Sequence, residues 1–215
     1  MNLSAARHNM ITQQIRPWDV SEERVLELML DTPREAFVPP AYRALAYVDM
    51  ELPLGHGRTM LPPRVEARLL QALNVQGDES VLEIGTGGGY LTALLARQAQ
   101  HVHSLEPVPE LSQAAAQRLH SNGFDNVTLE SGTIIWPQAK SYDVIVLTGS
   151  LPELPQALLD ALRVGGRLFA VVGEAPVMEA QLITRSGERE WTQADLFETE
   201  LPPLPGLSQR SRFSL

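Results

Sequence analysis

Gly85, Gly87 and Gly89 form the segment of this sequence that is best suited to binding a ligand. They follow a short apolar run and precede a helical run that starts at Tyr90. Glycine permits a tight turn with backbone angles that other residues rarely adopt, and it lets a ligand approach the backbone closely. Glu83 lies two residues before the first glycine, where its carboxylate could support an ammonium group directly or through the loop. The pattern predicts a ligand-binding loop between a strand and a helix.

A second acidic residue, Glu106, ends the next apolar run, HVHSLE. A carboxylate at that position can accept hydrogen bonds from both hydroxyls of a ribose. The glycines fall as G-x-G-x-G and not as the G-x-G-x-x-G of dinucleotide-binding domains, which disfavours a nicotinamide or flavin cofactor. The structural alternative is that the glycines only make a tight turn and that Glu106 is a solvated strand end.

The spacing of apolar residues predicts the elements that must position these side chains. Strands are expected at residues 80–84, 101–106, 126–131, 142–149 and 166–173, and helices at 90–99, 108–121 and 153–163. Because strands alternate with helices, the expected fold class is α/β, with a mostly parallel, doubly wound sheet. Residues 179–199 are expected to form a C-terminal β-hairpin with its turn near residue 186.

Helical spacing and prolines predict a helical region before this sheet. Helices are expected at 3–16, from residue 21 and from residue 65, with a loop or short strand across 47–62. We therefore expect three regions. Residues 1–63 would form a helical N-terminal region and cleft loop, 64–200 the ligand-binding domain, and 201–215 an extended, proline-rich tail.

Composition narrows the class of protein. The chain has 215 residues, a formal net charge of −9 and no cysteine, so disulfides and thiolate chemistry are excluded. The negative charge disfavours nucleic acid as a partner, and no apolar run approaches the ~20 residues of a membrane span. The chain shows no apolar signal segment, and its five histidines lack metal-ligand spacing. We expect a cytoplasmic protein without a metal and without membrane contact.

The glycine loop and its preceding acid have the arrangement of class I methyltransferases, whose loop wraps the amino-acid end of S-adenosylmethionine. More specifically, the chain resembles the protein-L-isoaspartate O-methyltransferase family over residues 20–185. Five stretches carry the likeness: TPREAFVPP, ELPLGHGRTMLPP, VLEIGTGGGYLTALLA, YDVIVLTGSLPELPQALLDAL and GGRLFAVVG. The resemblance implies a Rossmann-like fold and methyl transfer to the free α-carboxylate of L-isoaspartyl residues in damaged proteins.

The resemblance also implies where the site residues lie, with the methionine portion at the glycine loop, the ribose at Glu106 and the adenine beside Gly132. The expected cofactor-binding residues are Glu83, Gly85, Thr86, Gly87, Gly89, Glu106, Gly132 and Thr133. The expected cleft residues are His56, Thr59, Leu61 and Thr148. No catalytic base is assigned, because a carboxylate acceptor with a pKa of about 4 is already ionised near neutral pH.

The sequence leaves structural alternatives open for three of the cleft residues. His56 could be an ordinary loop histidine, and Thr148 could simply end its strand. Thr59 could instead cap the helix that begins after Pro63.

Three departures from the family pattern affect the acceptor side and the adenine. Leu61 stands where the family has a serine close to the methyl-transfer site, and Thr133 stands where it has an aspartate near the adenine. The tail at 201–215 replaces the family's usual F-V-P-L ending. These changes predict a diverged member that keeps S-adenosylmethionine binding and could have lost isoaspartyl repair. A methyltransferase for another protein or small-molecule acceptor, and a non-catalytic binding module, are the alternatives, and the oligomeric state stays open.

Overall fold

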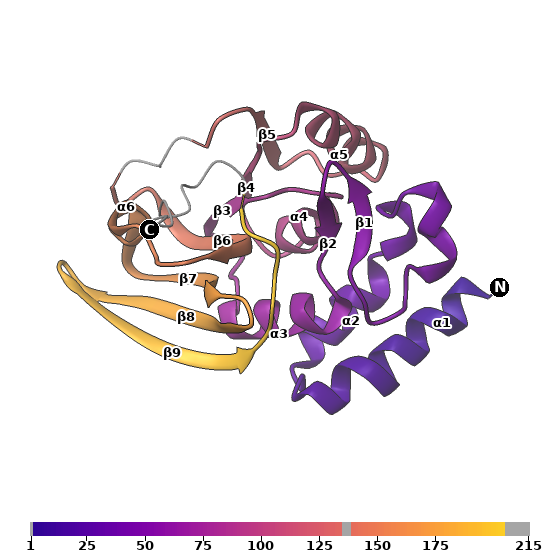
Figure 1. The fold of residues 1–215 in the computed structure, drawn as a ribbon, viewed down its shortest axis with the longest axis horizontal. Coiled ribbons are helices and arrows are strands. Elements are labelled where there is room, and N and C mark those ends of the chain that lie inside the picture. Colours follow the sequence, from indigo (N-terminus) through magenta and orange to yellow (C-terminus); the bar gives the residue numbers. More distant parts are fainter. Residues whose placement is uncertain (1, 135–138, 205–215) are drawn as a thin grey trace, which may run out of the picture.

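The computed structural model describes residues 2–134 and 139–204. Those residues form a central seven-stranded sheet in the order β5-β4-β3-β6-β7-β8-β9 (Figure 1). The strands are β3 (Ser80–Ile84), β4 (His101–Glu106), β5 (Val127–Ser131), β6 (Tyr142–Leu151), β7 (Leu162–Glu174), β8 (Val177–Gly187) and β9 (Glu190–Glu198). From β5 to β7 neighbouring strands are parallel, whereas β8 and β9 add as an antiparallel hairpin. The mostly parallel sheet with a C-terminal hairpin is confirmed.

Helices cover the sheet and form most of the N-terminal region (Figure 1). They are α1 (Leu3–Met10), α2 (Glu23–Asp31), α3 (Pro63–Leu73), α4 (Tyr90–Ala96), α5 (Pro109–Ser121) and α6 (Gln156–Ala161). Short helical turns cover Ile11–Ile15, Arg16–Trp18, Arg34–Ala36 and Pro40–Leu45, and β1 (Leu52–Gly55) pairs with β2 (Arg58–Met60). Within the described residues no helix is long and apolar enough to cross a bilayer.

The alternation of side chains along each strand divides the core into two layers, because successive residues point to opposite faces. Val81 of β3 packs in the layer that contains Leu70 of α3 and Leu94 of α4. Its neighbour Leu82 packs in the other layer, with Leu158 of α6. The sheet is therefore covered on both faces, as a doubly wound fold requires. Side chains of α1 and α2 belong to the first layer as well, and the domain boundary at residue 63 stays a prediction.

The bounds of α6 and β7 differ from those predicted. α6 begins at Gln156 instead of residue 153, because Pro155 disfavours a helical conformation in the residue before it and itself acts as the N-cap. β7 begins directly after α6, at Leu162 instead of residue 166, because Leu162 pairs with Tyr142 of β6.

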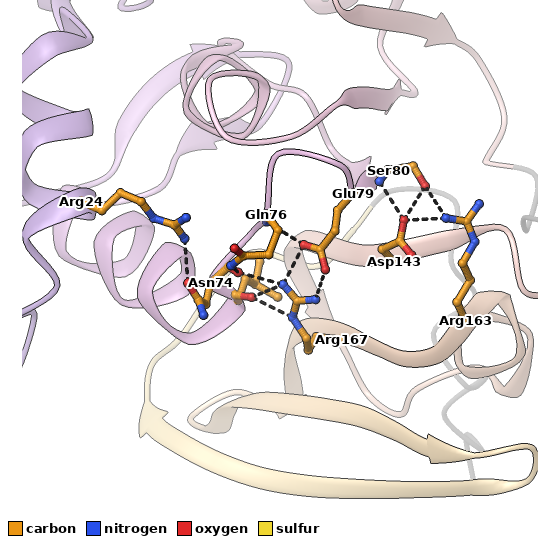
Figure 2. A network of polar contacts seen from close by, with 9 residues as sticks. Arg24, Asn74, Gln76, Glu79, Ser80, Asp143, Arg163 and Arg167 are labelled. Carbon is orange, nitrogen blue, oxygen red and sulfur yellow. Dashed lines mark hydrogen bonds and ion pairs between the residues drawn. The ribbon is translucent and has the colours of Figure 1, made fainter.

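A polar network lies at the amino ends of the parallel strands (Figure 2). Arg167 of β7 donates from Nε to the carbonyl of Leu73 at 2.8 Å, at the end of α3, and it pairs with Glu79. The Asp143 carboxylate of β6 accepts a hydrogen bond from the amide of Ser80 at 2.9 Å. Arg167 thus joins the end of α3 to β7, and Asp143 joins β6 to the start of β3. The opposite, carboxyl ends of the strands are where ligands bind in open α/β sheets.

Candidate functional site

The loop between β3 and α4 needs its glycines both for conformation and for space. Gly85, Gly87 and Gly89 have φ angles of 101°, 54° and 85°, in the left-handed region that favours glycine. A Cβ on Gly85 would lie 2.1 Å from Oγ1 of Thr148. That hydroxyl donates to the carbonyls of Ile84 and Gly85, at 3.1 and 2.7 Å. Thr148 therefore fastens the loop to β6, and β6 continues beyond it, so simple strand termination is wrong.

Glu106 lies at the end of β4 and is only 3% exposed, so it is not a solvated strand end. Its Oε2 accepts a hydrogen bond from the amide of Gly87 at 2.8 Å, and its Oε1 accepts one from the amide of Val108 at 3.0 Å. Each carboxylate oxygen offers two lone pairs. Glu106 can therefore hold the glycine loop and still accept hydrogen bonds from a ligand.

Two adjoining cavities lie beside this loop. Both are lined by Thr59, Gly85, Gly87 and Thr148. The first extends to Thr86, Leu61 and Glu66. The second extends to Glu106 and to Pro202 and Leu204 of the C-terminal segment. Together the cavities bring four of the eight predicted cofactor residues and three of the four predicted cleft residues to one place.

Glu83 lies beneath the loop and not in either cavity. Its side chain is fully buried, and its Oε2 accepts hydrogen bonds from Thr92 of α4 at 2.5 Å and Ser104 of β4 at 2.6 Å. The Ser104 hydroxyl also lies 2.6 Å from that of Thr86 in the loop. Burial raises the pKa of Glu83 from 4.5 to about 8, although the hydrogen bonds from Ser104 and Thr92 lower it. Of the two routes expected for Glu83, this geometry favours support through the loop.

Leu61 and Thr59 lie on the segment from β2 to α3. The Leu61 side chain is 7% exposed and forms an apolar wall of the first cavity. The Thr59 hydroxyl donates to Glu51 at 2.7 Å. No side chain caps α3, whose N-cap is Pro62, so the alternative that Thr59 caps this helix is wrong.

Besides Glu83, four predicted site residues lie outside these two cavities. His56 is exposed in the turn between β1 and β2, with a φ angle of 53°. Gly89 faces α5, where an added Cβ would lie 3.4 Å from Ala115. Gly132 and Thr133 line a separate cavity, with His103 of β4 and Tyr142 of β6. Their assignment to the adenine stays a prediction. No group of three or more His, Asp or Glu residues among the described parts of the chain could hold a metal ion.

The first cavity is also lined by Glu66, which was not among the predicted site residues. It is 2% exposed and ion-paired with Arg34, which is fully buried. Arg34 also donates to the carbonyl of Leu61 at 2.6 Å, and its guanidinium carbon lies 4.9 Å from the Tyr90 ring centre. Burial raises the pKa of Glu66 to about 7, and Arg34 lowers it. The signal was present, because Glu66 shares one face of α3 with the buried residues four and seven positions later.

The predicted C-terminal tail contributes a wall of the second cavity. Ser150 of β6 donates from its hydroxyl to the carbonyl of Leu201 at 2.8 Å, and it forms a parallel bridge with Pro203. Arg58 of β2 donates to the carbonyl of Pro203 at 2.9 Å. Residues 201–204 are therefore extended and docked, as part of the predicted tail, while 205–215 lie outside the described residues.

The chain is similar to known proteins over most of its length. The family model for protein-L-isoaspartate (D-aspartate) O-methyltransferase matches residues 5–208. A Marinobacter nauticus protein named protein-L-isoaspartate O-methyltransferase 2 is 40% identical over 208 residues, covering 95% of each chain. A Gloeobacter violaceus protein-L-isoaspartate O-methyltransferase is 42% identical over 166 residues, covering 76% of this chain and 81% of its own.

Solved structures share the fold. A β-aspartate methyltransferase (PCMT) structure from Plasmodium falciparum, in complex with S-adenosyl-L-homocysteine, superposes with a TM-score of 0.80 at 21% identity. The match covers 96% of this chain and 99% of that one. The model match over nearly the whole chain and the relatives at about 40% identity decide the family. The chain belongs to the protein-L-isoaspartate O-methyltransferase family.

Proposed function

We propose that this chain transfers a methyl group from S-adenosylmethionine to the free α-carboxylate of an L-isoaspartyl residue in a protein or peptide. Family membership supports the reaction. The observation that carries the proposal is that the glycine loop and Glu106 line the same joined cavities as the apolar wall at Leu61. One cleft thus offers a place for a nucleoside beside a place for an acceptor.

The residues present fit this cofactor. The loop backbone at Gly85 and Gly87 lines both cavities without side chains. The Glu106 carboxylate lines the second cavity with lone pairs left for ribose hydroxyls. S-adenosylmethionine carries no phosphate, so the cleft needs no anion-binding loop.

The reaction requires positioning more than proton transfer. When bound, S-adenosylmethionine supplies an electrophilic methyl group on its sulfonium. The acceptor carboxylate is ionised near neutral pH, and its oxygen forms the bond to the methyl carbon as the carbon–sulfur bond breaks. Leu61 and Tyr90, both nearly buried, line the first cavity and limit the access of water to it. Alignment and desolvation of the two reactants would supply most of the rate enhancement.

The substrates and the location of the reaction follow from the same proposal. Protein or peptide chains with isoaspartyl residues are the expected partners, and the net charge of −9 argues against nucleic acid. We place the activity in the cytoplasm, a reducing compartment that suits a chain without cysteine.

The test is transfer of labelled methyl from S-adenosylmethionine to a peptide that contains one L-isoaspartyl residue. The matched control is the same peptide with normal aspartate. We expect labelling of the first peptide, labile to base as a methyl ester is, and none of the second. Binding of S-adenosylhomocysteine without labelling of either peptide would refute the isoaspartyl residue as the acceptor. It would favour the hypothesis of a diverged family member that has lost isoaspartyl repair. Absence of binding would refute the whole proposal.

A further inference from the structure

Glu66 is a carboxylate placed where the cofactor's amino-acid end would lie. It lines the first cavity, whereas Glu106 lines the second. The residues common to both cavities, among them Gly85 and Gly87, lie between these two acids. A nucleoside with its ribose at Glu106 would therefore extend its other end along the glycine loop towards Glu66.

The carboxylate of Glu66 has one oxygen engaged and one available. Its Oε2 is paired with Arg34, and within the described residues no hydrogen bond to its Oε1 is found. Glu66 is 2% exposed and lines the cavity, so its remaining accessible surface faces that space. Oε1 is therefore an open acceptor of up to two hydrogen bonds that still lacks a partner. A ligand cation in the first cavity would supply one.

Arg34 holds this carboxylate in place. Its guanidinium binds Glu66, the carbonyl of Leu61 and the face of Tyr90, so it joins the wall of the cavity to α3 and α4. Arg34 itself is fully buried and is not among the residues that line the cavity. It is therefore a positioning residue, and Glu66 is the group that faces a ligand.

The other acid near the loop, Glu83, is not available for such a contact. Its side chain is fully buried and lines neither cavity, so a ligand there cannot reach it. Its Oε2 accepts from Thr92 and Ser104, and its Oε1 is enclosed by the protein. S-adenosylmethionine ends in an α-ammonium, which needs an acceptor. We propose that Glu66 accepts a hydrogen bond from the α-ammonium of the cofactor and so selects ligands that carry the amino-acid end. This inference rests on the proposed function, because it assumes that the cofactor occupies the cleft.

The experiment is a double-mutant cycle between one side chain and one ligand group. The variant is Glu66→Gln, and the ligands are S-adenosylhomocysteine and its deaminated analogue, which lacks only the ammonium. Isothermal titration is expected to show that wild type binds S-adenosylhomocysteine about 10–100-fold more tightly than the analogue, the range for a charged hydrogen bond. In Glu66→Gln that ratio is expected to fall to within about threefold.

A second variant separates this role from a structural one. Glu66→Gln leaves Arg34 buried without its charged partner, which can destabilise the fold. The double variant Arg34→Met/Glu66→Leu removes both charges at similar volume, and thermal unfolding reports whether it is folded. It should lose the same preference for the ammonium while it retains affinity for the analogue.

The outcomes distinguish the inference from the proposed function. If the folded variants keep the wild-type ratio of affinities for the two ligands, Glu66 does not bind the ammonium and the inference is overturned. Methyl transfer by wild type would still support the proposed function in that case. If wild type binds neither ligand, the inference and the proposed function are both refuted.

Discussion

At the scale of single residues, the carboxylates that line the cleft already accept hydrogen bonds or form ion pairs within the protein. Glu106 receives two backbone amides, from Gly87 and Val108, before any ligand is bound. Its position is therefore set in advance for the ribose that we propose to bind there. Preorganisation of this kind lowers the entropic cost of binding.

Glu106→Gln is expected to weaken binding of S-adenosylhomocysteine by about 10–100-fold, because the charged acceptor is lost and the glutamine nitrogen cannot accept from the amide of Gly87 or Val108. Isothermal titration measures the effect. The control is Glu110→Gln, which makes the same chemical change at an exposed position of α5. Equal affinities for the two variants would contradict a ribose contact at Glu106.

Two substitutions at Leu61 test whether the side chain at this position contacts the methyl acceptor. Leu61→Ser and Leu61→Ala open a similar cavity in the wall, at a cost of about 2–5 kcal/mol for a leucine-to-alanine change, and they differ by one hydroxyl. If that hydroxyl can reach the acceptor, KM for an isoaspartyl peptide should be about two- to tenfold lower in the serine variant. Identical steady-state kinetics in the two variants would show that position 61 does not contact the acceptor.

The buried acids beneath the cleft make stability depend on pH. The pKa of Glu83 is raised from 4.5 to about 8, chiefly by burial and also by the charges of Glu106 and Glu66, and that of Glu66 is raised to about 7. A raised pKa means that the folded state holds the proton more tightly than the unfolded state. The two protonated acids therefore contribute to the free energy of unfolding fully below pH 4.5, and this contribution is lost as the pH rises towards 8. The lowered pKa of Asp143 acts below this window.

Glu83→Gln is therefore expected to flatten the decline in stability between pH 5 and pH 8. Near pH 8 the variant should exceed wild type by more than about 1.4 kcal/mol, the equivalent of one pKa unit. Urea unfolding at a series of pH values measures this difference. A variant that is less stable than wild type at pH 8, and equally dependent on pH, would refute the linkage to Glu83.

At the scale of elements, the cleft is built where three segments distant in sequence meet. The β1–β2 hairpin, the glycine loop and residues 201–204 all line the second cavity. In Figure 1 the yellow segment after β9 crosses in front of the sheet towards β4. The hydrogen bond from Arg58 to the carbonyl of Pro203 joins two of these segments.

Arg58→Met should loosen this cover and speed the dissociation of S-adenosylhomocysteine by about two- to tenfold, the range for one hydrogen bond. Stopped-flow displacement measures the rate. Arg43→Met makes the same substitution at an exposed position of the N-terminal region and should leave the rate unchanged. An unchanged rate in Arg58→Met would show that the contact does not hold the cover closed.

The same scale explains what the sequence could predict. Strands, helices and the glycine loop follow from the local spacing of apolar residues and glycines, and the acid at Glu106 follows from its place at a strand end. The burial of Glu66 follows from its place on α3, but its ion pair with Arg34, which lies 32 positions earlier in the chain, could not be predicted in the same way. The docking of residues 201–204 on Ser150 depends on a contact across about 50 positions. Such pairings follow from the packing of the whole fold and not from any local pattern.

At the scale of the whole molecule, the cleft and the polar network lie at opposite ends of the sheet. The cleft lies at the carboxyl ends of the parallel strands, and the network of Figure 2 lies at their amino ends. Within that network Arg167 donates hydrogen bonds to Glu79 and to the carbonyls of Leu73 and Asn74. Its side chain is 17% exposed, whereas that of Arg163 is 49% exposed.

Arg167→Met is expected to lower the free energy of unfolding by about 1–3 kcal/mol, because it removes the donors to Glu79 and to the carbonyl of Leu73. Arg163→Met, at the exposed pair with Asp143, should cost no more than about 1 kcal/mol. Urea unfolding measures both values, and both variants should keep wild-type affinity for S-adenosylhomocysteine. A similar small cost for the two variants would show that the network does not fasten α3 to the sheet.

The most direct measurement of the central claim is a crystal structure of the chain with S-adenosylhomocysteine bound. We predict the nucleoside in the joined cavities, with the ribose hydroxyls within hydrogen-bond distance of Glu106 and the thioether between the glycine loop and Leu61. A ligand bound elsewhere, or a ribose remote from Glu106, would contradict it.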